Sequence, residues 1–118
     1  MNAAAKARGL FPYAAGRTIG RSMAKPFDTS SGDLTADRRA DYAEMLFGSG
    51  EPGAAAEVMI GALELAPGWA LGWFRLGEFH EVANAMPAAV EAWRIAQKLD
   101  PADRAGASLK LALAGAEA

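Results

Sequence analysis

The sequence contains no cysteine and only one histidine, and these absences exclude several kinds of chemistry. Without cysteine the chain can form no disulfide framework, no thiolate metal site and no cysteine nucleophile. A single histidine, His80, argues against a histidine-based metal site. We therefore expect no bound metal, and the lack of cysteine is in keeping with the cytoplasmic location that we expect.

Long apolar runs are absent as well, and so are acidic residues near the N-terminus. No uninterrupted apolar run reaches the roughly 18 residues of a membrane-spanning helix, so we expect no membrane segment. Residues 1–27 carry five basic residues and no acid, whereas the rest of the chain carries 14 acids and seven bases. The net charge of -2 therefore hides a basic leader before an acidic domain, and an acidic domain is poorly suited to nucleic acid.

The leader, residues 1–32, has no sustained periodicity and ends in the loop-forming stretch "TSSGD". We expect it to be disordered, because glycine and proline interrupt it repeatedly. Its basic, acid-poor composition is also compatible with a targeting segment, although it lacks the apolar core of a secretory signal. The composition changes at Met23, which favours that residue as the natural start of translation.

A repeat of 34 residues follows the leader. Pro67 and Pro101 lie 34 residues apart and end two similar phrases, "ALELAP" and "AQKLDP". Aligning these prolines pairs further residues, namely Tyr42 with Leu76, Ala43 with Gly77, Ala55 with Ala89, Met59 with Trp93 and Ala62 with Ala96. The pattern predicts helix–turn–helix units over residues 36–69 and 70–103.

Local signals support these helices. Pro52 and Pro87 each suit a first helical turn, where no N–H partner is needed, and Pro101 marks a helix end. Gly77 and Ala89 are small, as a close crossing of two helices requires. Residues 104–114 continue as one more helix, in which Leu109, Leu111 and Leu113 are expected to cover the second repeat.

The repeat resembles the tetratricopeptide repeat (TPR). The second copy carries seven residues of the family signature: Trp73, Leu76, Gly77, Ala89, Trp93, Ala96 and Pro101. The first copy departs from the pattern at Arg39 and Met59, and a polar Arg39 suits the exposed end of an array. The resemblance implies an all-α solenoid over residues 33–118, with two repeats and a C-terminal capping helix.

The stretch "GSGEPG" at residues 48–53 matches the G-x-G-x-x-G pattern of a phosphate-binding loop. No buried strand precedes it, and "ANAMPA" occupies the equivalent place in the second repeat. Asn84 then takes the place of Gly50, and both residue types tolerate a positive φ. We interpret the stretch as a turn between helices and expect no cofactor.

The other reactive side chains have structural interpretations. His80 shares an apolar stripe with Trp73 and Leu76, and no nucleophile has matching spacing, so we expect a packing histidine rather than a general base. Trp73 and Trp93 fall on facing helices of one repeat, with Trp69 in the turn between repeats. We therefore predict no catalytic residue.

The resemblance also implies a binding groove, because the first helices of TPR units line a concave surface that holds peptides. The positions carried over are Asp37, Ala40, Glu44, Phe47, Leu71, Phe74, Glu78 and Glu81. These residues predict an acidic groove with apolar patches, which suits a basic or basic–apolar protein segment. The groove is equally compatible with packing against another domain of the same protein.

Three phrases carry a closer resemblance: "MAKPFDTSSGDLTADRRADYAEML", "APGWALGWFRLGEFHE" and "LDPADRAGASLKLAL". They are similar to the N-terminal region of bacterial TPR-containing methyltransferases that use S-adenosylmethionine. The sequence has no strand with a glycine-rich cofactor loop, so the resemblance implies architecture and not catalysis. We expect a non-catalytic interaction scaffold, or alternatively a truncated methyltransferase module whose partner is its own missing catalytic domain. Two repeats are few for a TPR array, which makes a homo-oligomer a further possibility.

Overall fold

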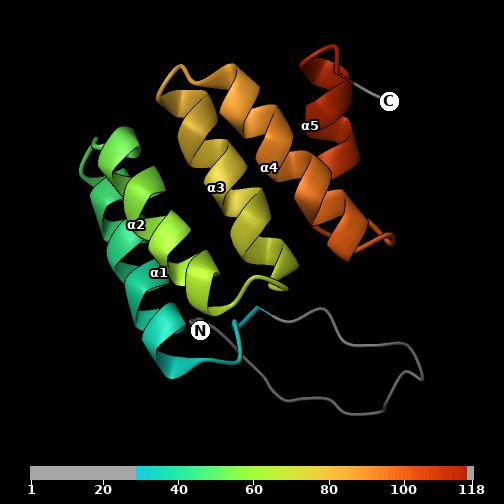
Figure 1. The fold of residues 1–118 in the computed structure, drawn as a ribbon. Coiled ribbons are helices and arrows are strands. Elements are labelled where there is room, and N and C mark those ends of the chain that lie inside the picture. The colour runs from blue at the N-terminus through green and yellow to red at the C-terminus, as the bar shows by residue number, and fades with distance from the viewer. Residues whose placement is uncertain (1–28, 117–118) are drawn as a thin grey trace, which may run out of the picture.

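The computed structural model describes residues 29–116, and this part of the chain contains five α-helices and no strand (Figure 1). The helices are α1 (Leu34–Gly48), α2 (Pro52–Leu65), α3 (Ala70–Val82), α4 (Met86–Leu99) and α5 (Ala107–Leu113). The all-α prediction is therefore confirmed. Met23 and most of the leader predicted to be disordered, residues 1–28, lie outside the described residues. The last part of that leader, residues 29–32, is described, and Ser30 and Ser31 donate hydrogen bonds to Asp37.

Helices that follow one another in sequence pack side by side. The extensive contacts join α1 to α2, α2 to α3, α3 to α4 and α4 to α5, and Figure 1 shows the helices in this order across the molecule. Short turns at residues 49–51, 66–69 and 83–85 reverse the chain between the first four helices. No helix within residues 29–116 has both the length and the apolarity needed to cross a membrane.

The ends of the helices follow local chemistry. Asp33 caps α1, since its carboxylate accepts a hydrogen bond of 2.8 Å from the backbone N–H of Ala36. Such a cap contributes about 1 kcal/mol. Pro52 and Pro87 lie in the first turns of α2 and α4, and α4 ends at Leu99, two residues before Pro101. These three predictions are confirmed.

The glycine-rich stretch is a turn, as predicted. Gly50 has a φ of 83° and Asn84 a φ of 63°, so the two aligned residues both adopt the left-handed conformation. The backbone N–H of Gly50 donates to Phe47, and that of Asn84 donates to Glu81. The turns after α1 and α3 are thus built alike.

The core consists of two clusters of buried side chains. The first lies between α1, α2 and α3 and contains fully buried Met59 and Phe79. The second joins α4 to α5 around Trp93, which is 0% exposed. Trp73 packs against both clusters and so connects them. The stripe predicted on α3 omitted Phe79, which is more deeply buried than the partly buried His80.

Gly77 lies directly against the ring of Trp93. A Cβ atom at residue 77 would lie 2.2 Å from Trp93 Nε1, closer than any side chain tolerates. The predicted need for a small residue at this crossing is therefore confirmed. The same indole nitrogen is buried without a hydrogen-bond partner in the described structure.

The C-terminal helix differs from the prediction in its start and in its apolar face. Helix α5 begins at Ala107 because residues 100–106 form a loop held by Asp100, whose carboxylate binds the backbone and the guanidinium of Arg104. Only Leu111 of the three leucines is buried. Leu109 and Leu113 are 63% and 76% exposed, so the expectation that they cover the second repeat is wrong.

Candidate functional site

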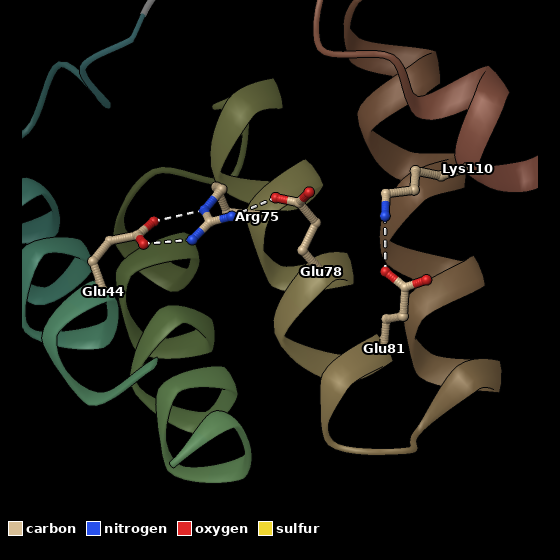
Figure 2. Close-up of polar contacts among 5 residues, drawn as sticks. All are labelled: Glu44, Arg75, Glu78, Glu81 and Lys110. Carbon is tan, nitrogen blue, oxygen red and sulfur yellow. Dashed lines mark hydrogen bonds and ion pairs between the residues drawn. The ribbon is translucent and has the colours of Figure 1, made fainter. Parts of the chain in front are cut away.

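The eight predicted groove residues lie on α1 and α3, and the structure connects several of them through two basic residues. We call the set formed by Glu44, Arg75, Glu78, Glu81 and Lys110 the charged face (Figure 2). Its side chains come from α1, α3 and α5. Ion pairs thus join helices that are not consecutive in sequence.

Arg75 is at the centre of the charged face. Its Nε donates to Glu44 Oε2 at 2.7 Å while Nη2 donates to Glu44 Oε1 at 2.5 Å, so α3 holds α1 through a two-pronged contact. Its Nη1 donates to Glu78 at 2.5 Å. The hydrogen bonds that Arg75 donates to Glu44 raise the pKa of its guanidinium; burial opposes this rise, and the hydrogen bond to Glu78 adds to it. Arg75 is therefore fixed as a cation.

Arg75 also covers two aromatic rings. Its guanidinium carbon lies 5.3 Å from the ring centroid of Phe47 and 4.8 Å from that of Phe79. The two rings are themselves 4.8 Å apart. Phe47, which the sequence assigned to an apolar patch of the groove, therefore lies partly buried beneath a cation. A basic group near aromatic faces gains cation–π attraction in this arrangement.

The second ion pair between non-consecutive helices links α3 to α5. Lys110 Nζ lies 2.8 Å from Glu81 Oε1 and 5.4 Å from the ring centroid of Trp93. The face therefore carries three carboxylates and two cations, which leaves a net charge of about -1 if all five groups are ionised. The sequence analysis missed both cations, although Arg75 stands three residues from Glu78 on the same helix.

The apolar groove positions are largely covered. Ala40 is 6% exposed, and Leu71 and Phe74 are partly buried. Phe74 packs against the cluster around Trp93. The apolar component of the face is thus limited to the exposed parts of Leu71, Phe74 and Phe47.

A hollow lies at the other end of α1, away from Arg75. We call it the α1 pocket; it has a volume of about 250 Å³ and is lined by Thr29, Ser30, Asp37, Ala40, Asp41 and Trp69. Asp37 accepts hydrogen bonds from the hydroxyls of Ser30 and Ser31 and from the Ser31 backbone. Those bonds, chiefly the one from the Ser31 side chain, lower the pKa of Asp37. The pocket therefore holds a carboxylate that stays ionised well below neutral pH.

The remaining reactive groups do not assemble into a site within the described part of the chain. His80 is partly buried on α3, and burial lowers the pKa of its imidazole. Trp73 Nε1 donates to the backbone oxygen of Pro67 at 2.8 Å. Among residues 29–116 no group of three or more histidine, cysteine, aspartate or glutamate side chains is arranged to hold a metal ion.

Comparisons with known proteins give no direct indication of function. A scan against protein-family models finds no match, and no curated protein is significantly similar in sequence. Function therefore has to be argued from the charged face and the α1 pocket.

Proposed function

We propose that the chain is a non-catalytic protein-interaction module of the tetratricopeptide type. In this proposal α1–α2 and α3–α4 are the two repeats, α5 is the cap, and α1, α3 and α5 line the concave binding surface. The 34-residue spacing and the matching left-handed residues Gly50 and Asn84 support the repeat assignment. The observation that carries the binding proposal is the charged face, which spans these same three helices.

The partner is a basic or basic–apolar segment of a protein. The Glu44 and Glu81 side chains are 43% and 35% exposed although each is already paired, so both can accept a further donor. Leu71 and Phe74, which lie between Glu44 and Glu81 in the sequence, supply partly exposed apolar surface. Arg75 and Lys110 disfavour a purely cationic segment, because neighbouring like charges repel. A segment that alternates basic and apolar side chains therefore fits best.

Binding of a labelled synthetic peptide that alternates lysine and leucine tests this proposal, with fluorescence anisotropy as the readout. In the variant Glu44→Gln/Glu81→Gln we expect roughly tenfold weaker binding, because two partly exposed ion pairs contribute about 0.5–1 kcal/mol each. The matched control Glu57→Gln/Glu64→Gln removes the same charge from exposed positions of α2. Equal weakening in the control, or equal binding of a peptide with glutamate in place of lysine, would contradict the proposal.

The alternative function is that of a methyltransferase module that is inactive alone and contacts its own catalytic domain. The uncovered Leu109 and Leu113 on α5 favour it, since a following domain packed there would bury both leucines. Immunocapture from the source cells, followed by intact mass measurement, separates the two functions. A mass near 12.3 kDa supports the stand-alone scaffold, whereas a mass several-fold higher supports the module.

A further inference from the structure

The α1 pocket differs from the charged face in how its carboxylates are balanced. On the charged face each of the three glutamates is paired with Arg75 or Lys110. In the pocket Asp37 receives only neutral hydroxyl and amide donors. Asp41 is exposed and forms no ion pair with another residue in the range 29–116. The pocket lining therefore contains two carboxylates and no basic residue.

The shape of the pocket suits the end of one long basic side chain. Ala40 is buried at its base, and Trp69 forms a wall that is fixed by packing, because a Cβ at Gly72 would lie 2.4 Å from Trp69 Cε3. Tryptophan is the aromatic ring that binds cations best. A lysine or arginine inserted here would meet a tryptophan ring and the carboxylates of Asp37 and Asp41 together.

A source of such side chains is joined directly to the pocket. Thr29 and Ser30 belong to its lining, and the basic segment of the leader, residues 1–27, precedes them in the sequence with only Asp28 between. Lys25 is four residues and Arg21 eight residues before Thr29. Since an extended chain spans up to about 3.6 Å per residue, both side chains can reach a pocket that begins at Thr29. A short tether also gives an effective concentration on the order of millimolar, which makes weak contacts significant.

We propose that the chain's own basic segment, residues 1–27, occupies the α1 pocket through Arg21 or Lys25. The occupant is chosen by charge and by connection: residues 1–27 have five basic residues and no acid, and the pocket lining that begins two residues later in the sequence has two carboxylates and no basic residue. The inference goes beyond the proposed function, since an external peptide can bind the charged face whether or not the leader fills the pocket.

Paramagnetic relaxation enhancement measured on the full chain tests this proposal. The protein has no cysteine, so Ser22→Cys provides a single site for a nitroxide label between the two basic residues. We expect the label to broaden the Trp69 indole N–H signal of the ¹⁵N-labelled protein strongly. Asp41→Lys should reduce this broadening several-fold, and the charge swap Asp41→Lys with Arg21→Glu and Lys25→Glu should restore it.

The control variant is Glu64→Lys, which makes the same charge reversal at an exposed position of α2 and should leave the broadening unchanged. Broadening that Asp41→Lys does not reduce, or that Glu64→Lys reduces as much, would overturn the proposal. A mixture of ¹⁵N-labelled chain without nitroxide and unlabelled chain with nitroxide shows whether the leader of a second copy enters the pocket. Broadening in that mixture as strong as the broadening within one chain would also overturn the proposal. If peptide binding persists in the variants while the broadening is insensitive to Asp41, only the leader inference fails.

Discussion

Gly77→Ala tests the packing of the second helix pair with a single added methyl group. The new Cβ would lie 2.2, 2.4 and 2.7 Å from three atoms of the Trp93 ring. Trp93 is 0% exposed and belongs to the cluster that also contains Ala89 and Leu111, so the ring has little room to move. The added methyl group must therefore push α3 away from α4 or force the ring off its preferred rotamer.

Two opposing effects determine the change in the free energy of unfolding. Alanine stabilises a helix interior by about 1 kcal/mol relative to glycine. Overpacking a filled core costs about 1–3 kcal/mol, and occasionally more. Three contacts under 3 Å with the largest buried side chain place the cost at or above the upper end of that range. We expect a net destabilisation of about 2 kcal/mol, which for a domain of this size lowers Tm by roughly 8–16 °C.

Urea unfolding followed by far-UV circular dichroism measures this change, and Gly61→Ala is the matched control. Gly61 lies inside α2, and a Cβ there would meet only the Arg39 side chain, at an ordinary 3.6 Å. We expect Gly61→Ala to stabilise the protein by up to about 1 kcal/mol. The same substitution should thus have opposite signs at two helical positions.

A stability for Gly77→Ala equal to or above that of the original chain would refute the packing argument. A second measurement uses Trp93→Phe, which removes the nitrogen-bearing ring that the methyl group would strike. If the clash is the cause, the double variant Gly77→Ala/Trp93→Phe should be more stable than the sum of the single effects allows, by at least about 0.5 kcal/mol. Strict additivity would assign the cost to another source.

Two further predictions concern α3. Arg75→Ala should lower the free energy of unfolding by about 1–2 kcal/mol in urea, because it leaves Glu44 and Glu78 without their cation and removes two cation–π contacts. The control Arg38→Ala, at an exposed position of α1, should change that free energy by less than about 0.5 kcal/mol. Equal effects of the two variants would contradict the role given to Arg75. Burial lowers the pKa of His80 in the folded chain from 6.5, so the unfolded chain binds the proton more readily than the folded chain does. The stability of the fold should therefore fall as the pH drops below about 6.5. His80→Gln should remove this pH dependence of Tm in melting curves recorded across that range.

The sequence predicted those parts of the fold that depend on local rules or on small residues at fixed spacing. Pro52, Pro87 and the equivalent pair Gly50 and Asn84 act within a few residues of themselves, so their effect can be read without a structure. Gly77 was also identifiable, because a glycine inside a helical pattern calls for a packing reason. The all-α class follows from these signals together.

The charged face could be anticipated only in part. The resemblance to the tetratricopeptide repeat placed Glu44 and Glu81 at candidate groove positions, but it gave no distance between α1 and α3 or between α3 and α5. The Arg75–Glu44 contact joins residues 31 positions apart and depends on that distance. The exposure of Leu109 was missed for a related reason: the Asp100–Arg104 contact delays the start of α5, and the position of that helix against α4 sets which leucine is buried. Sequence spacing alone does not encode either geometry.

The way in which α1, α3 and α5 are joined has a mechanical consequence. Consecutive helices make the most extensive contacts, whereas α1–α3 and α3–α5 share side chains of the two core clusters and are joined at the surface by the long side chains of Arg75 and Lys110. Partly exposed ion pairs on flexible stems lengthen at little cost and weaken further as salt screens them. The surface links between these three helices are therefore easier to deform than the clusters of buried side chains beneath them. Ionic strength, or a ligand that competes for Glu44 or Glu81, would loosen the surface links from α3 to α1 and α5 while both cores stay intact.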